Sequence, residues 1–212
     1  MSEQQRSLRS ESVHAHSIHG DSGDRVSYAK RMVGIDASRP FIAVRVAILT
    51  VSDTRSSADD ASGQLLAERA TTAGHHVVAR HIVRDEQAEI EQQLRSFIAD
   101  PNVEVVLATG GTGITGRDVT PEAMRNVIEK EIVGFGELFR QLSYASIGTS
   151  TIQSRALAGV ANGTYLFALP GSPGACRDAW DQILVQQLDN RYRPCNFVEL
   201  LPRLRETSPA GR

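Results

Sequence analysis

The chain has 212 residues, of which 41% are hydrophobic and 23% charged, a balance that suits one α/β domain of ordinary size and a remainder outside its core. A formal net charge of -2 without a lysine and arginine stripe argues against a protein that binds nucleic acid electrostatically. The longest apolar run, around Val44 to Val51, is too short to span a bilayer, and the first thirty residues lack the apolar core of a secretory signal. We therefore expect a cytoplasmic protein with no membrane or nucleic-acid partner.

The first part of the chain differs in composition from the rest. Residues 1–38 are rich in Ser, His, Arg, Asp and Gly, and their isolated apolar residues follow neither the helix nor the strand period. Such a segment cannot bury enough apolar surface to fold, so we expect a disordered N-terminal tail. We expect one domain over residues 39–205 and a flexible C-terminus at residues 206–212.

The first half of the predicted domain alternates strands with helices. VRVAILTVS, from Val44 to Ser52, is a nearly continuous apolar strand, which is typical of a parallel sheet buried on both faces. HVVARHIV, from His76 to Val83, and VEVVLAT, from Val103 to Thr109, are predicted to be the next strands. Helical spacing of apolar residues predicts a helix in each interval, the first stopped by Gly74 and the second opened by Asp85. Their inward residues are predicted to be Leu66, Ala70 and Ala73, then Ile90, Leu94, Phe97 and Ile98.

The second half adds helices and a hairpin. Thr120 as N-cap and Pro121 as first helical residue predict a helix start, and Asn162-Gly163 between two strand-like runs is a strong hairpin signal. Pro170 to Gly174 is predicted to lead into a last long helix. The fold class is therefore α/β, with helices on a mostly parallel sheet and an antiparallel edge strand. Three helices are expected in this half. Their inward residues are predicted to be Met124, Val127 and Ile128 in the first; Phe135, Leu138, Phe139 and Leu142 in the second; and Cys176, Trp180, Ile183 and Leu184 in the last.

The stretch GTGITG, from Gly111 to Gly116, fits the pattern G-x-G-x-x-G of dinucleotide-binding proteins. A true fingerprint has its third glycine just inside a helix, whereas four residues separate Gly116 from Pro121. A P-loop is excluded because no Gly-Lys-Ser/Thr follows. An NAD-dependent oxidoreductase remains an alternative that rests on this pattern alone.

Four unusual loops follow predicted strands, and in open α/β sheets ligands bind at the carboxyl ends of the strands. The loop after Thr109 contains Gly110, Gly111, Gly113 and Gly116, so its backbone N–H groups can approach an anion closely. Thr109, Thr112 and Thr115 add hydroxyl groups, and Arg117 can pair bidentately with a phosphate. The sequence therefore predicts a phosphate-binding site.

Two aspartates flank this predicted site. Asp85 and Asp118 each precede a helix, where an aspartate is commonly a cap, and capping is the favoured interpretation for Asp85 taken alone. Thr120 is the better cap for its helix, which leaves the Asp118 carboxylate available. Carboxylates beside a phosphate-binding loop are ligands that Mg²⁺ requires. The leading hypothesis is thus a nucleotide-dependent phosphoryl or nucleotidyl transfer.

Several blocks, in order, resemble the molybdopterin-binding family of molybdenum cofactor biosynthesis, the MoaB/MogA proteins. They are TGGTGITGRDVTPEA, EIVGFGELFRQLS, SRALAGV and LPGSPGA. SDTRSSADDASGQLL and QLDNRYRPCNF are more similar to the MoaB branch than to MogA. The resemblance covers about residues 44–198.

The resemblance implies a three-layer α/β/α subunit that assembles as a trimer or hexamer and binds molybdopterin through its terminal phosphate, with other enzymes of the pathway as further partners. MogA-type members transfer an adenylyl group from Mg-ATP to that phosphate and release pyrophosphate. The two aspartates of that reaction correspond to Asp85 and Asp118, expected to be catalytic and to bind Mg²⁺. Residues expected to bind substrate or phosphate are Ser52, Asp53, Thr109, Gly110, Gly111, Thr112, Gly113, Arg117, Ser154, Arg155, Pro170, Gly171, Ser172 and Pro173.

A second hypothesis is a non-catalytic molybdopterin-binding or scaffold protein in the same pathway. Some MoaB-branch proteins depart from the RDE and GRD patterns and are thought not to catalyse adenylylation. This chain keeps both aspartates and the arginine, at Asp85, Arg117 and Asp118. That retention favours activity.

Overall fold

The computed structural model describes residues 33–206. Most of the predicted N-terminal tail and nearly all of the predicted C-terminal segment lie outside the described residues, so those two predictions stay untested. Within the described part of the chain, no helix is both long enough and apolar enough to cross a membrane.

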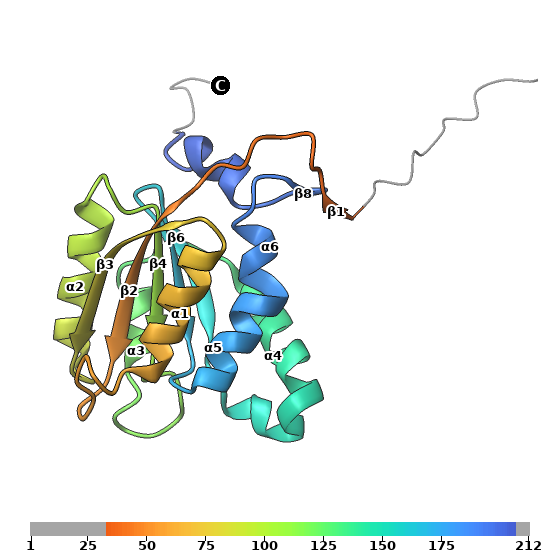
Figure 1. Ribbon diagram of the computed structural model, residues 1–212. Coiled ribbons are helices and arrows are strands. Elements are labelled where there is room, and N and C mark those ends of the chain that lie inside the picture. Colours follow the sequence, from red (N-terminus) through yellow and green to blue (C-terminus); the bar gives the residue numbers. More distant parts are fainter. Residues whose placement is uncertain (1–32, 207–212) are drawn as a thin grey trace, which may run out of the picture. The chain divides into compact units, whose positions relative to one another are not determined.

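The centre of the domain is a six-stranded sheet in the order β3-β2-β4-β7-β6-β5 (Figure 1). Strands β3, β2, β4 and β7 are parallel, β6 is antiparallel to β7, and β5 is antiparallel to β6. The predicted mostly parallel sheet with an antiparallel strand is therefore confirmed. The antiparallel strand, β6, is not the edge strand that was predicted, because the short β5 pairs outside it. The strands are β2 (Arg45–Val51), β3 (His76–Val83), β4 (Val105–Thr109), β5 (Lys130–Glu131), β6 (Leu157–Ala161) and β7 (Thr164–Leu169).

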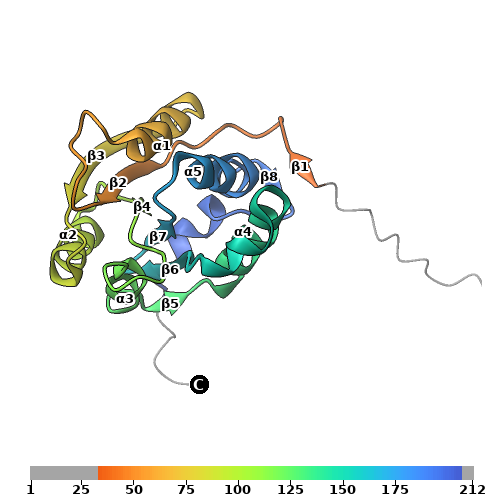
Figure 2. The same cartoon turned by 90° about the horizontal axis from the view of Figure 1, so that it is seen from below.

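Helices cover both faces of this sheet, which gives the expected three layers (Figure 2). One apolar core lies between the sheet and the side of α1, α4 and α5, and the other between the sheet and α2 and α3. Alternate residues of β2 point to opposite cores: Val46 and Ile48 to the first, Ala47 and Leu49 to the second. The helices are α1 (Ala61–Thr72), α2 (Gln87–Ala99), α3 (Thr120–Arg125), α4 (Val133–Ile147), α5 (Pro173–Ala179) and α6 (Val185–Gln187).

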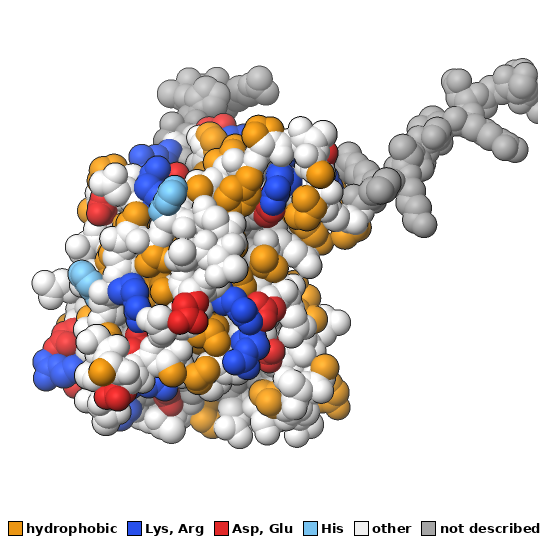
Figure 3. All heavy atoms as spheres, in the orientation of Figure 1, with side chains coloured by type: hydrophobic (Ala, Val, Ile, Leu, Met, Phe, Trp, Pro, Cys, Tyr) orange, Lys and Arg blue, Asp and Glu red, His pale blue; other side chains and the backbone are white. Residues whose placement is uncertain are grey.

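Shorter elements complete the domain. A 3-10 turn, η1 (Gly148–Gln153), follows α4, a π turn, η2 (Trp180–Leu184), joins α5 to α6, and a last 3-10 turn is η3 (Val198–Arg203). Strands β1 (Gly34–Ile35) and β8 (Tyr192–Arg193) form a separate antiparallel pair. On the face drawn in Figure 3, basic and acidic side chains are interspersed, with no single large basic patch.

The hairpin between β6 and β7 forms at the predicted position. Asn162 and Gly163 have φ of 46° and 79°, so both turn residues adopt the left-handed conformation that asparagine and glycine tolerate best. The hairpin places β7 beside β4 with its carboxyl end at the same edge as that of β4.

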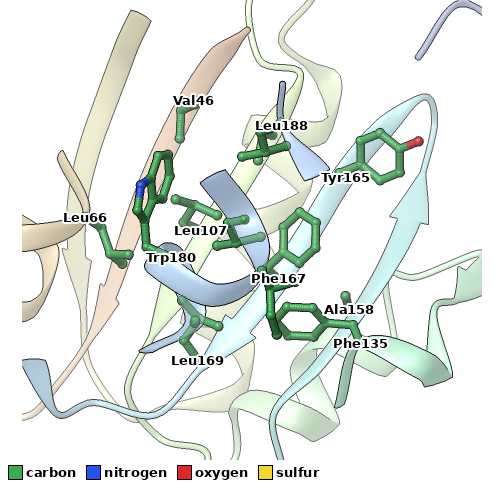
Figure 4. Close-up of a cluster of buried hydrophobic side chains, with 14 of the residues drawn as sticks. Val46, Leu66, Leu107, Phe135, Ala158, Tyr165, Phe167, Leu169, Trp180 and Leu188 are labelled. Atoms are coloured by element: carbon green, nitrogen blue, oxygen red, sulfur yellow. The ribbon is translucent and has the colours of Figure 1, made fainter. Parts of the chain in front are cut away.

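Aromatic side chains pack α4 and η2 against the sheet (Figure 4). The rings of Phe135 and Phe167 meet edge to face with centroids 5.1 Å apart, and Trp180 is buried in the same core. The prediction that Leu138 faces inward is wrong, because this side chain is 42% exposed. The inner face is centred on Phe135, Gly136, Phe139 and Ser143, since a Cβ at Gly136 would lie 2.5 Å from the Ala156 carbonyl oxygen.

Candidate functional site

A cavity of about 1030 Å³ opens at the carboxyl edge of the parallel strands. Its wall comes from the loops after β2, β3, β4 and β7, and from α4 and η1. The four loops predicted to meet at this edge therefore do meet. Of the residues predicted for the site, those that line the cavity are Ser52, Asp85, Gly110, Gly111, Thr112, Gly113, Arg117, Asp118, Ser154, Pro170, Gly171, Ser172 and Pro173.

The glycine loop begins directly at the end of β4. Gly110 and Gly111 have φ of 105° and 61°, and a Cβ at Gly110 would lie 2.2 Å from the Val51 carbonyl oxygen. The backbone therefore passes closer to the end of β2 than any other residue type allows. The Thr120 hydroxyl donates a hydrogen bond to the Gly110 carbonyl at 2.8 Å, which ties the loop to the start of α3.

This contact corrects the predicted helix start. Thr120 lies inside α3, Val119 is at the N-cap position, and that cap makes no side-chain hydrogen bond. The Thr120 hydroxyl is used on Gly110 instead, because that buried carbonyl needs a donor. The interpretation of Thr120 as the cap is therefore wrong.

Asp118 is held by the glycine loop itself. Its carboxylate accepts hydrogen bonds from the backbone N–H and the hydroxyl of Thr115, at 2.8 and 2.6 Å. Burial opposes ionisation, but these hydrogen bonds and the nearby Arg155 charge outweigh it and lower the pKa of Asp118 below its usual value. The site therefore keeps a negative charge here at neutral pH.

Asp85 is linked to Asp53 of the first loop. The Asp53 N–H donates to the Asp85 carboxylate at 3.0 Å, and the Asp85 N–H donates to the Asp53 carboxylate at 3.2 Å. Burial and the Asp53 charge raise the pKa of Asp85, and the Asp118 charge adds to the effect. Asp85 does not open α2, which begins at Gln87 with Glu86 at its N-cap position, so the capping interpretation of Asp85 is wrong.

Arg117 lines the cavity, but its guanidinium forms ion pairs with two carboxylates. Its guanidinium spans both Asp53 carboxylate oxygens at 2.8–3.1 Å and contacts Glu86 at 2.9 Å. The Arg117 hydrogen bond lowers the pKa of Asp53. The bidentate geometry predicted for a phosphate is thus occupied by a carboxylate, and a phosphate-binding role for Arg117 stays a prediction.

Three predicted residues support the wall without lining it. Asp53 is the partner of Arg117, and Thr109 is buried and donates to the Pro170 carbonyl at 3.0 Å. Arg155 donates to the carbonyls of Gly113 and Asp118 and pairs with Glu122, so it holds the glycine loop from behind. These residues position the loops that form the cavity.

The loop Pro170–Gly174 touches the glycine loop. A Cβ at Gly171 would lie 3.1 Å from the Gly110 Cα, so the two loops approach through glycine on both sides. The Ser172 hydroxyl caps α5 by accepting from the Ala175 N–H at 3.2 Å. The loop Pro170–Gly174 therefore contacts the glycine loop through backbone and begins α5 at the same edge of the sheet.

Sequence reasoning missed two parts of the wall. The first is Arg55, although it lies in a loop that was singled out. The second is the side formed by α4 and η1. Its only sequence signal was a run of small hydroxyl residues, and helical periodicity does not show that this run borders a ligand cavity. The hydroxyl residues of α4 and η1 on this side are Ser143, Ser146, Ser150 and Thr151.

Residues 47–190 match a family model described as "Probable molybdopterin binding domain". Molybdenum cofactor biosynthesis protein B of Escherichia coli (strain K12) is 54% identical over 160 residues, which cover 76% of this chain and 94% of that relative. A crystal structure of a molybdenum cofactor biosynthesis protein B matches with a TM-score of 0.72 at 41% identity, covering 78% of this chain and 98% of the other.

A more distant structure carries the same fold. The tungsten cofactor synthesizing protein MoaB from Pyrococcus furiosus matches with a TM-score of 0.64 at 33% identity, covering 77% of this chain and 98% of that one. The matched family segment includes every residue of the predicted site, from Ser52 to Pro173. The chain therefore belongs to the molybdopterin-binding family of MoaB-type molybdenum cofactor biosynthesis proteins.

Proposed function

We propose that this protein acts in molybdenum cofactor biosynthesis by binding molybdopterin in the cavity and transferring an adenylyl group to its terminal phosphate from Mg-ATP. The observation that carries the proposal is that Asp85 and Asp118, from loops after different strands, line the same cavity as the glycine loop. Family membership supports the pterin as ligand.

The proposed reaction needs no protein nucleophile. A terminal phosphate oxygen of the pterin forms a bond to the α-phosphorus of ATP, and the bond from that phosphorus to the bridging oxygen breaks as pyrophosphate leaves. Catalysis then consists of positioning the two phosphates and compensating their charge. The rigid glycine loop supplies N–H groups, and Arg155 keeps that loop in place through the Gly113 carbonyl.

The two carboxylates fit a magnesium ion. Among residues 33–206, no cluster of three His, Cys, Asp or Glu side chains is arranged to hold a metal, so the protein supplies few ligands. Mg²⁺ commonly takes one or two carboxylates and completes its shell with phosphate oxygens and water. Asp85 and Asp118 would hold the ion, which would supply charge neutralisation. The pKa of Asp85 is raised first by burial and then by the Asp53 and Asp118 charges, and a cation would compensate those charges.

An assay with molybdopterin, ATP and Mg²⁺, read by mass, tests the function. We expect adenylyl-molybdopterin and pyrophosphate. Molybdopterin binding without product would instead identify a non-catalytic binding or scaffold protein in the same pathway. A change at nicotinamide, which the G-x-G-x-x-G pattern alone suggests, is not expected.

We also propose a homo-oligomer, a trimer or a hexamer of two trimers. Large apolar side chains on α4 and η1 are exposed in the single chain, with Leu138 at 42%, Tyr144 at 59%, Ile147 at 53% and Ile152 at 81%. A partner copy that covered this surface would remove it from water.

A further inference from the structure

The two arginines that line the cavity differ in how their charges are compensated. Arg117 pairs with Asp53 and Glu86. Arg55 forms no ion pair with any carboxylate in residues 33–206, whereas many other arginines in that range do. The positive charge that remains for an anionic ligand is therefore that of Arg55.

Arg55 lies where the two glycine-containing loops touch. Its Nη2 donates to the Gly171 carbonyl at 2.9 Å and its Nη1 to the Ser62 hydroxyl at 3.4 Å. Gly171 in turn packs on Gly110, the first residue of the glycine loop. A guanidinium has five donor hydrogens, so these two hydrogen bonds leave others for a ligand.

Charge changes sign along the glycine loop. Gly110 lies beside Gly171, the contact of Arg55, whereas a Cβ at Gly111 would lie 2.9 Å from an Asp85 oxygen and one at Gly113 would lie 2.8 Å from an Asp118 oxygen. The start of the loop is thus linked to a cation through Gly171, and its continuation is next to two carboxylates. An anion is favoured at the first position and a cation at the second.

We propose that Arg55, rather than Arg117, binds the terminal phosphate of the pterin and so sets the ligand's orientation in the cavity. This inference rests on the proposed function. The phosphate lies at Gly110 and Gly171, and the metal-bound nucleotide lies toward Asp85 and Asp118. The two reacting phosphates are then neighbours along one loop.

The Gly171 carbonyl does not depend on Arg55 alone for a hydrogen bond. The Ser62 hydroxyl donates to the same Gly171 carbonyl at 2.7 Å, so this carbonyl keeps a hydrogen bond when Arg55 is removed. Ser62 does not line the cavity and carries no charge. The substitution Ser62→Ala therefore disturbs the same carbonyl while leaving the proposed phosphate ligand intact.

The test compares R55Q, R55K, R117Q and S62A in equilibrium binding, each first checked for an unchanged thermal melt. The probes are molybdopterin, molybdopterin whose phosphate has been removed by a phosphatase, and inorganic phosphate. R55Q should weaken molybdopterin and inorganic phosphate binding by about 10- to 100-fold, the effect of one charge-assisted hydrogen bond, and leave the dephosphorylated pterin unaffected. R55K should lose less, R117Q less than R55Q, and S62A less than about threefold.

Two results overturn the inference. One is an equal loss of both pterins in R55Q, which would mean that Arg55 only shapes the cavity. The other is a phosphate-specific loss in R117Q that exceeds the loss in R55Q. If the native protein binds inorganic phosphate through Arg55 but neither pterin, the proposed function fails while the anion site stands; if molybdopterin binds independently of Arg55, the inference alone fails.

Discussion

Asp85 shows how a site residue can work against the stability of its own fold. Its carboxylate is half-buried and lies near the charges of Asp53 and Asp118, so ionisation is disfavoured in the folded state and its pKa is raised. An asparagine would keep an acceptor oxygen for the Asp53 N–H while removing the charge. The proposed catalytic role of Asp85 and the stability of the fold therefore favour different charge states at this position.

We predict that Asp85→Asn raises the free energy of unfolding of the metal-free protein at pH 7, by no more than about 1 kcal/mol because solvent screens the charge. A raised folded-state pKa means that ionisation of Asp85 costs stability as the pH rises. The advantage of the variant should shrink as the pH falls through the raised pKa and vanish below 3.8, where native Asp85 is also neutral. Urea unfolding of both proteins across this pH range measures the difference in their free energies of unfolding. A variant that is less stable than the native protein at pH 7 would contradict this prediction.

The glycines of the glycine loop differ in how closely other atoms pack around them. Gly110 has φ of 105° and would clash with the Val51 carbonyl, whereas Gly116 has open space around it. We predict that Gly110→Ala costs more than about 2 kcal/mol of stability, since strain and overlap add, while Gly116→Ala stays within about 0.5 kcal/mol. Thermal or urea unfolding of the two variants provides the comparison, and equal effects would show that the loop is not packed on β2 as described.

Elements with a strong local signal could be predicted from the sequence. The strand His76–Val83 and the Asn162-Gly163 turn occur at their predicted positions, because apolar runs and left-handed turn residues act locally. The prediction for α4 was wrong at Leu138, since the orientation of this helix depends on the close approach of Gly136 to the Ala156 carbonyl, just before β6. Helical periodicity alone carries no information about that approach.

The site was predictable as a set of loops and not as a set of contacts. The topology of a parallel sheet brings its loops to one edge, which is why the glycine loop and both aspartates line one cavity. The partner of Arg117 is Asp53, 64 residues away, and the partner of Arg55 is Gly171, 116 residues away. Such pairings are set by tertiary packing, so the choice between the two arginines needed the structure.

At the scale of the whole molecule, the exposed apolar residues of α4 and η1 make a prediction about assembly. We predict that Ile152→Asp converts the proposed oligomer to a smaller species, because a carboxylate buried at an apolar interface is costly. Ile42→Asp is the matched control, since Ile42 is 53% exposed but lies outside α4 and η1. Light scattering coupled to size exclusion gives the masses. A native protein that is already monomeric at micromolar concentration would contradict the proposed assembly.

Single-turnover adenylyl transfer by the native protein and by Asp118→Asn, with molybdopterin binding measured in parallel, tests the proposed reaction at this cavity. We expect that native protein forms adenylyl-molybdopterin, and that the variant binds the pterin but reacts at least about 100-fold more slowly, since a carboxylate proposed to hold the metal is lost. Equal rates in the two proteins, or no product from the native protein despite pterin binding, would contradict the assignment of this cavity as an adenylyl-transfer site.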